Sequence, residues 1–422
     1  MNAAPKRRLL LRGAAAVTLA LAVAEEGRGE PVLAIDAAFP GGSAETVAID
    51  AAAAFIHIRP ALREGRGWPC WWYFEVKNAV PGREMTLRVS GNPGPFRPGG
   101  KALAASWAQP RNAAISTDRR AWSRTPAGEF DTEAHTATYR FSAPAKRFWL
   151  AWGPPFLPAD ADELLETAAK AVAGAEIFTL ARTRGDRPVR GIRLGAAEAP
   201  AAIWVQARQH AWEAGGSWVG RGFLDWIAGD APEAVRLRER TEIFFVPIMD
   251  IDNAAQGAGG KEAVPRDHNR DWSDTPVYPE VAAAQRRIAA LEAAGRLRLF
   301  VDLHNPGPGD KEPFFYGPFD HETMTGGTRE HYDRWIALAA EEISGPLPLR
   351  PTYRFATYVT TEEERGRMSS GWVRNHSDPA RVVSVTLETA WNTPHSTAEG
   401  YRTVGGQLAR AVARYLGETA SK

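Results

Sequence analysis

Cysteine is almost absent from this chain, which has one, Cys70, in 422 residues. A single cysteine excludes an intramolecular disulfide and any zinc site built from two or more cysteines. A charge excess of either sign is also missing, because 51 Lys and Arg residues face 50 Asp and Glu residues, for a net charge of +1. That balance argues against a dedicated nucleic-acid binder, and we expect no nucleic-acid partner.

Long apolar runs are missing too, since none reaches the roughly 20 residues that a membrane-spanning helix needs. The apolar run at residues 13–24 follows the basic segment 6–12 and ends in Ala-Val-Ala. This order is typical of a cleaved signal peptide, and the pair Arg7-Arg8 resembles a twin-arginine signal. We therefore predict export to the periplasm or medium, removal of residues 1–24, and no stable membrane insertion afterwards. The alternative interpretation is a frayed N-terminal helix.

The remaining chain has two regions of different texture. Residues 31–157 contain short alternating or aromatic runs, such as 71–76, 85–89 and 137–141, and Gly and Pro gather at 91–100 between them. Several short strands separated by turn residues predict an antiparallel β-sandwich domain.

Strands and helices alternate in the second region, residues 158–418, after a helix expected near 159–173. The expected strands are Ile203–Ala207, Ile243–Met249, Leu297–Leu303 and Val382–Leu387, and the expected helices are Trp218–Ile227, Glu280–Ala294, Glu330–Ile343 and Gly400–Leu416. This alternation predicts an α/β domain with a mixed, mostly parallel sheet flanked by helices. In such sheets, active sites form beyond the carboxyl ends of the strands.

Metal-binding side chains follow three of these strands. His210 and Glu213 come after the first, His304 ends the third, and Glu388 ends the fourth. The spacing of His210 and Glu213 would put both on one face of a helical turn. Two His and one Glu form a catalytic zinc set with an open position for water, and the other Glu would act as the general base.

A second motif adds an anion-binding group. Asp267, Asn269 and Arg270 lie in the segment 265–272, which follows the second strand. Arg binds a carboxylate through two parallel hydrogen bonds better than any other side chain does.

With these residues in view, the chain resembles the zinc metallocarboxypeptidases, and within them the cytosolic-carboxypeptidase-like branch, which has bacterial members. The front region fits that branch as well, through the aromatic strand 71–74 and the aromatic strand that leads into a Pro-rich joint at 148–158. The matching catalytic segments are residues 208–213, 267–270, 301–304 and 386–389. The resemblance implies a carboxypeptidase fold, one zinc ion per chain, and peptide substrates with a free C-terminal carboxylate.

The resemblance also implies a role for each matching position. These roles are zinc binding by His210, Glu213 and His304, general-base catalysis by Glu388, carboxylate binding by Asn269 and Arg270, and orientation of a zinc histidine by Asp267.

Some positions depart from the pattern of the family. The arginine that polarises the scissile carbonyl is missing from its place, and either Lys261 or Arg266 could supply the charge. Tyr358 is the candidate for the substrate-binding tyrosine, and Trp372 could fill part of that space. His268 stands where the branch usually has an apolar residue.

From this resemblance we expect a zinc-dependent peptidase that removes one residue from the C-terminus of a peptide. Two alternatives stay open: an N-acyl amino acid amidohydrolase of the aspartoacylase kind, and an inactive, peptidase-like binder. The preferred C-terminal residue is open as well, although Arg374, if it borders the pocket, would favour acidic residues.

Overall fold

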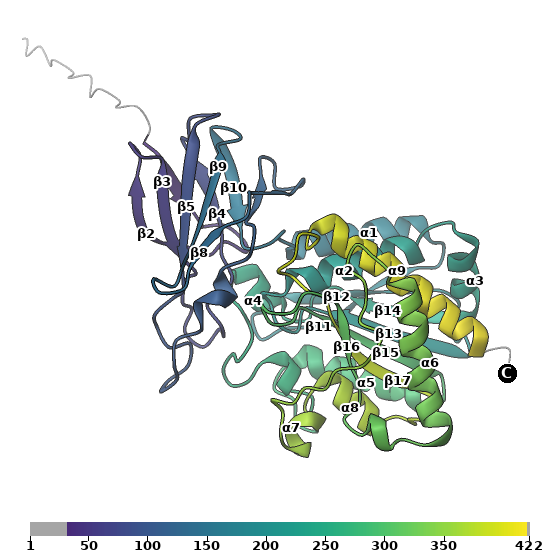
Figure 1. The fold of residues 1–422 in the computed structure, drawn as a ribbon. Coiled ribbons are helices and arrows are strands. Elements are labelled where there is room, and N and C mark those ends of the chain that lie inside the picture. Colours follow the sequence, from purple (N-terminus) through teal and green to yellow (C-terminus); the bar gives the residue numbers. More distant parts are fainter. Residues whose placement is uncertain (1–31, 420–422) are drawn as a thin grey trace, which may run out of the picture. The chain divides into compact units, whose positions relative to one another are not determined.

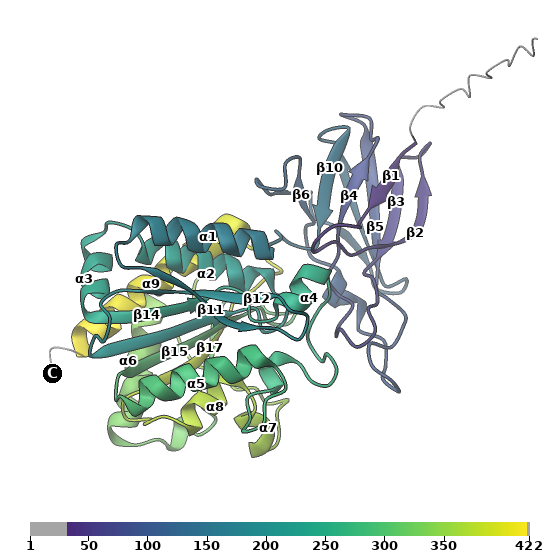
Figure 2. The same cartoon turned by 180° about the vertical axis from the view of Figure 1, so that it is seen from behind.

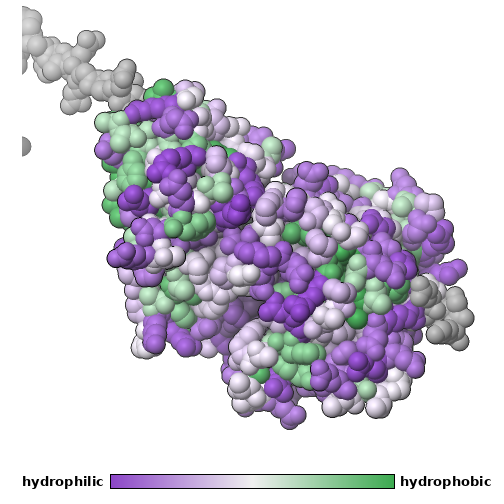
Figure 3. All heavy atoms as spheres, in the orientation of Figure 1, coloured by the Kyte–Doolittle hydropathy of each residue, from purple (hydrophilic) through white to green (hydrophobic). Residues whose placement is uncertain are grey.

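The computed structural model describes residues 32–419. The predicted signal segment, residues 1–24, lies outside the described residues. Among the described helices, none is long and apolar enough to cross a membrane. Figure 3 shows hydrophilic residues over most of one face, with small hydrophobic patches between them, in keeping with a core that holds most of the large apolar side chains.

The first region folds into two five-stranded sheets (Figures 1 and 2). One sheet has the order β1 (Ala34–Asp36), β4 (Tyr73–Lys77), β10 (Arg147–Ala151), β6 (Ala114–Ser116) and β7 (Ser123–Arg124). The other has the order β2 (Glu45–Asp50), β3 (Phe55–Arg59), β5 (Glu84–Ser90), β9 (Thr136–Ser142) and β8 (Glu129–Asp131). The inner faces pack on each other, as Phe141 of β9 meets Phe148 of β10 with ring centroids 6.0 Å apart.

The predicted sandwich is therefore confirmed, with one difference in its strand directions. Strands β3 and β5 pair in parallel, whereas the other pairs of these two sheets are antiparallel. The reason is topological, because β4 lies between them in sequence but belongs to the opposite sheet. The chain crosses over and returns in the same direction.

The second region contains a seven-stranded mixed sheet. Its order is β11 (Glu176–Arg182), β12 (Pro188–Leu194), β14 (Thr241–Val246), β13 (Ala201–Ala207), β15 (Leu297–His304), β17 (Val383–Glu388) and β16 (Phe314–Tyr316). The central strands β14, β13, β15 and β17 run parallel, and the outer strands pair antiparallel. Strand β14 ends three residues before the expected Met249, since Pro247 has no N–H to continue the ladder.

Helices cover both faces of this sheet, as predicted. The helices are α1 (Pro158–Ala171), α2 (Ala214–Ile227), α3 (Pro232–Arg240), α4 (Ile251–Gln256), α5 (Pro279–Ala293), α6 (Gly326–Glu342), α7 (Glu362–Gly366), α8 (Ser369–Asn375) and α9 (Ala398–Thr419), with short 3-10 turns at Ala105–Ala108, His268–Arg270 and His321–Thr323. Helices α1, α2 and α9 lie on one face, and α5 and α8 lie on the other (Figures 1 and 2).

The strand order creates a switch point beside β13. From β13 the chain moves to β14 on one side, and then crosses back to β15 on the other side. The connections after these strands therefore diverge to opposite faces and leave a crevice at the carboxyl ends of β13 and β15. The candidate ligand His210 follows the end of β13, and the candidate ligand His304 is the last residue of β15.

Candidate metal centre

Three strand ends bring the candidate metal and base residues together. Strands β13 and β15 pair in parallel, so the segment after Ala207 lies beside the end of β15. His304 is the last residue of β15 and faces Glu388, the last residue of β17, in register. Residues separated by more than 170 positions in sequence thus meet at one edge of the sheet, as the strand pattern predicted.

A tight turn after β13 carries the first two ligands. Glu213 N donates a hydrogen bond to His210 O at 3.1 Å, and Arg208 begins the turn with a left-handed φ of 64°. Helix α2 starts only at Ala214. The two side chains therefore share a face, as expected, through a single turn that precedes the helix rather than through the helix itself.

Glu213 lies between the two imidazole rings. Its Oε1 is 2.8 Å from Nδ1 of His210, and its Oε2 is 2.7 Å from Nδ1 of His304. All three side chains are buried, and one ligand atom from each lies within 4.8 Å of the others. Two nitrogens and a carboxylate gathered at this spacing form a donor set for a divalent metal ion.

Carboxylates stand behind both rings. Nε2 of His304 is 3.1 Å from Oδ2 of Asp302, and Nε2 of His210 is 3.5 Å from Oδ1 of Asp267. Such partners fix the orientation of a metal-binding imidazole. Among the described residues, Asp267 Oδ1 and Asp302 Oδ1 have no hydrogen-bond partner although they are buried. This concentration of negative charge around the two rings fits a bound cation.

The electrostatics of the acids agree with that reading. Although burial opposes ionisation, the charges of His210 and His304 lower the pKa of Glu213 to about 2. Burial also opposes ionisation of Asp267, yet Lys261 and His210 hold its pKa well below the usual range. Both carboxylates are therefore ionised near neutral pH.

Glu388 differs from these acids in having almost no partners. Burial raises its pKa to about 8, and its Oε2 is a buried atom without a hydrogen-bond partner in residues 32–419. Glu388 borders the same cavity as His210 and Glu213. An unpaired carboxyl group at this position is available to exchange a proton with a reacting group.

The anion-binding motif is held by a buried network. Oδ1 of Asn269 accepts hydrogen bonds from Gln209 Nε2 at 3.2 Å and from Ser369 N at 2.9 Å. Arg270 Nη1 donates to Asn269 O at 2.9 Å, and both Asn269 and Arg270 line the cavity. The 3-10 turn His268–Arg270 thereby presents an amide and a guanidinium to the cavity from a rigid base.

Lys261 and Arg266 are the two candidates for the positive charge that would polarise the scissile carbonyl. Lys261 Nζ lies 3.5 Å from Nε2 of His210, next to the metal ligands. The Nε of Arg266 lies 3.7 Å from Oδ1 of Asp271, although the side chain also borders the cavity. The geometry therefore favours Lys261, because its ammonium group lies beside a candidate metal ligand, whereas Arg266 lies beside Asp271.

The tyrosine expected near the substrate has two candidates. Tyr358 lines the cavity and is 61% exposed. Tyr316 of β16 also lines the cavity, and its position opposite Thr386 places it near Glu388. Trp372, the other expected residue, is 7% exposed and packs on Trp272 with ring centroids 5.8 Å apart. Trp372 is thus a core residue and does not line this cavity.

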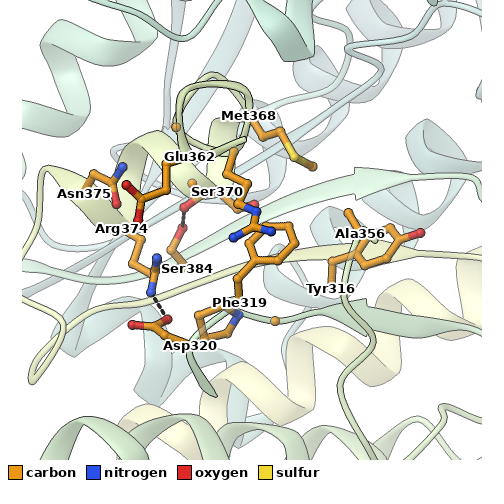
Figure 4. A pocket seen from close by; sticks show the side chains of 15 residues that line it. Tyr316, Phe319, Asp320, Ala356, Glu362, Met368, Ser370, Arg374, Asn375 and Ser384 are labelled. Atoms are coloured by element: carbon orange, nitrogen blue, oxygen red, sulfur yellow. Dashed lines mark hydrogen bonds and ion pairs between the residues drawn. The ribbon is translucent and has the colours of Figure 1, made fainter. Parts of the chain in front are cut away.

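The main cavity measures about 900 Å³, and a second cavity of about 420 Å³ adjoins it. Tyr316 and Met368 line both, so they form the partition between the two. Figure 4 shows Arg374 in the second cavity, where its guanidinium pairs with Asp320. Arg374 therefore borders a neighbouring cavity, with its charge already matched.

The structure also brings to this site several residues that were not predicted from the sequence. Asp302 precedes His304 by two positions in a strand, and that spacing puts both on one face of the sheet. The alternation of side-chain directions along the expected strand could therefore have identified Asp302 as a neighbour of His304. Trp68 and Trp107 of the first region also line the main cavity, and no local pattern in the sequence could have placed them there.

Comparisons with known proteins agree with this geometry. The profile of the cytosolic carboxypeptidase N-terminal domain matches residues 35–152, and the zinc carboxypeptidase profile matches residues 162–290. The second match includes His210 and Glu213 but stops before His304 and Glu388. The places of these two residues in the site therefore rest on the geometry described above.

Among curated proteins, cytosolic carboxypeptidase 2 of Xenopus tropicalis is 30% identical over 142 residues, which are 33% of this chain and 14% of that protein. The chain thus spans only a small part of that relative. A metallo-carboxypeptidase structure from Burkholderia cenocepacia covers 92% of this chain and all of its own, with a TM-score of 0.76 and 22% identity. The metallo-carboxypeptidase of Pseudomonas aeruginosa, solved with (2-guanidinoethylmercapto)succinic acid, covers 91% of this chain and 99% of its own, with a TM-score of 0.73 and 20% identity.

Proposed function

We propose that this chain, which belongs to the zinc carboxypeptidase family in its cytosolic-carboxypeptidase-like branch, removes single residues from the free C-terminus of peptides. One observation carries the proposal. His210 and Glu213 of the His-Glu-His cluster line a single cavity of about 900 Å³ together with the unpaired Glu388 and Arg270, and His304 completes the cluster. A metal centre, a base and a carboxylate-binding group in one cleft are the parts that such an exopeptidase requires.

The proposed metal is one zinc ion per chain, held by His210, Glu213 and His304. Two imidazoles and a carboxylate suit zinc and leave a position for water or substrate. When bound, zinc would lower the pKa of a water molecule and polarise the scissile carbonyl. Asp267 and Asp302 would keep the two rings oriented toward the metal.

The remaining steps belong to the side chains of the protein. Glu388 would accept the proton of the attacking water and pass it to the leaving amine. Lys261 would place a positive charge near the carbonyl oxygen as negative charge develops there. Arg270 and Asn269 would bind the terminal carboxylate, so that only the last peptide bond reaches Glu388.

An acyl amino acid amidohydrolase would use the same metal and carboxylate groups on a shorter substrate. The cavity favours the peptide, because its lining continues past the metal ligands to Trp68 and Trp107. We also propose that residues 1–24 direct export, which would make peptides outside the cytoplasm the substrates. The identity of the released residue follows from the test below.

The test is a mass-spectrometric time course with zinc-loaded protein. Peptides with varied C-terminal residues are supplied in pairs, one a free acid and the other its C-terminal amide. We expect stepwise loss of single residues from the free acids alone, and the fastest pair identifies the preferred residue. Hydrolysis of acyl amino acids without any loss from peptides would replace the proposal with the amidohydrolase. If the zinc-loaded protein hydrolyses neither peptides nor acyl amino acids, the result would indicate an inactive, peptidase-like binder.

A further inference from the structure

A loop of the sandwich runs directly beside the loop that carries Lys261. Residues 65–68 and residues 259–264 are joined by three backbone hydrogen bonds: Trp68 N to Lys261 O at 3.0 Å, Gly260 N to Arg66 O at 2.9 Å, and Val264 N to Gly65 O at 2.9 Å. The pairing resembles a short ladder between two strands. The conformation of the Lys261 loop therefore depends on a segment about 190 residues earlier in the chain.

Glycines make this close approach possible. A Cβ at Gly67, where φ is +82°, would lie 2.3 Å from Lys261 O. A Cβ at Gly259 would lie 2.0 Å from Trp68 O. Both distances are shorter than any real contact, so neither loop tolerates a side chain at these positions without moving apart. The two loops form one fixed unit.

Two indoles of the sandwich, Trp68 and Trp107, lie next to these paired loops and line the main cavity. Trp68 and Trp107 are half-buried, line the main cavity and contact each other with ring centroids 4.6 Å apart. Trp107 also meets Trp212 edge-on at 5.7 Å, and Trp212 is the residue before the metal ligand Glu213. Lys261 Nζ lies 5.9 Å from the Trp68 ring. The aromatic wall, defined here as Trp68 and Trp107, is thus continuous with the metal centre.

The wall and the carboxylate-binding residues have separate neighbours. Asn269 is held by Gln209 and Ser369, whereas the wall packs on Trp212 and the Lys261 loop. In the proposed complex, Arg270 binds the terminal carboxylate of the peptide, and the last peptide bond lies at the metal centre. The residues before that bond then need a binding surface of their own. Among the described cavity-lining groups, the aromatic wall is a pair of indoles, joined to the metal centre through Trp212, that the reaction leaves unused.

We propose that the N-terminal sandwich completes the active site, with Trp68 and Trp107 binding the substrate residues on the amino side of the scissile bond. The inference rests on the proposed function and adds a substrate class to it: extended peptides with an apolar or aromatic side chain two or three positions before the C-terminus. Indole faces bind such side chains by burial and ring packing. The wall leaves dipeptides without this contact.

The experiment compares rates on short and long peptides. Two acetylated substrates share the same last two residues, and the longer one adds two residues that include a phenylalanine. For the natural protein we expect kcat/KM to be about 3- to 10-fold higher for the longer peptide, as one aromatic contact allows. In Trp107→Ala the ratio of long to short should fall to about one. Trp107→Phe should keep part of it.

A matched control separates the wall from general damage to the sandwich. Trp122 is a half-buried indole of the same domain that packs on Tyr73 at 5.7 Å and does not line the cavity. Trp122→Ala should keep the full ratio. Trp107→Ala keeps the carbonyl that accepts the Trp152 indole N–H at 2.8 Å, so that link within the sandwich survives. A ratio in Trp107→Ala equal to that of the natural protein would overturn the proposal.

Failure of the proposed function would look different. If the zinc-loaded natural protein releases no residue from any peptide, the peptidase assignment fails, and binding of the same two peptides is measured by calorimetry. The wall still predicts tighter binding of the longer peptide by the same factor, and loss of that gain in Trp107→Ala. Equal affinities for both peptides in the natural protein would exclude substrate binding by the aromatic wall, whatever the outcome for the peptidase function.

Discussion

The buried His268, the first residue of the carboxylate-binding turn, gives the most quantitative prediction. Its Nε2 is 2.7 Å from Oε1 of Glu280, its Nδ1 is 3.7 Å from Oδ2 of Asp250, and its ring stacks on Tyr278 with centroids 4.0 Å apart. Burial alone would favour the neutral ring, but the charges of Asp250 and Glu280 raise its pKa to about 9. His268 is thus a buried cation held between two anions.

The size of the effect follows from proton linkage. The ordinary histidine pKa is 6.5, and each tenfold change in proton affinity corresponds to about 1.4 kcal/mol, so the raised pKa of His268 contributes on the order of 3 kcal/mol. Because the folded-state pKa lies above the unfolded value, this stability is fully present below pH 6.5. It is lost as the pH rises from 6.5 through about 9.

The assay is urea unfolding of the natural protein and of His268→Gln across this pH range. Gln keeps a donor for Glu280 but carries no charge. The free energy of unfolding of the natural protein should exceed that of the variant at low pH, and this difference should shrink by on the order of 3 kcal/mol above pH 9. Titrating groups that do not interact with His268, including Glu388, cancel in the difference. If the difference in unfolding free energy between the two proteins stays constant from pH 6 to 10, the pKa of His268 is not raised in the folded protein.

Substitutions at three further positions test the metal centre and the cleft. Glu388→Gln should lower kcat/KM by about 10²- to 10⁴-fold while the protein keeps its metal, as measured by peptide assay and elemental analysis. Arg270→Gln should raise KM by about 10- to 100-fold, the worth of a charge-assisted pair, and reduce the preference for free acids over amides; an unchanged KM would exclude the carboxylate role. Lys261→Met should lower kcat by about 10²- to 10³-fold, with Lys261→Arg recovering part of the rate; full activity of the methionine variant would direct attention to Arg266.

The sequence predicted the scaffold of the site well, because burial leaves a strong pattern. Strands β13 and β15 are largely apolar, as expected for parallel strands covered on both faces, and β17 alternates Val and Leu with the buried polar residues Ser384 and Thr386. Once those strands were placed, their carboxyl ends located His210, His304 and Glu388. Strands β11 and β12 were absent from the prediction, since neither is a continuous apolar run: β11 begins and ends at the exposed Glu176 and Arg182, and β12 contains Arg190 and Arg193.

The contacts that shape the cleft had no local signal. The pairing of residues 65–68 with residues 259–264 joins two loops, and loops carry no periodicity from which a partner could be inferred. Gln209 holds Asn269 through a buried side-chain network that only the folded chain assembles. Arg374 was expected to border the pocket for the released residue, and it lines the smaller cavity, where it pairs with Asp320.

The proposed hydrolysis depends on one metal ion held by His210, Glu213 and His304. A zinc titration of metal-free protein tests this dependence, with release from a free-acid peptide and from its amide followed at each step. We expect release from the free acid alone, with a rate that rises linearly and levels off at one equivalent of zinc. His304→Ala should neither retain zinc nor gain activity. Full activity without metal, or equal release from the amide, would exclude the proposed mechanism.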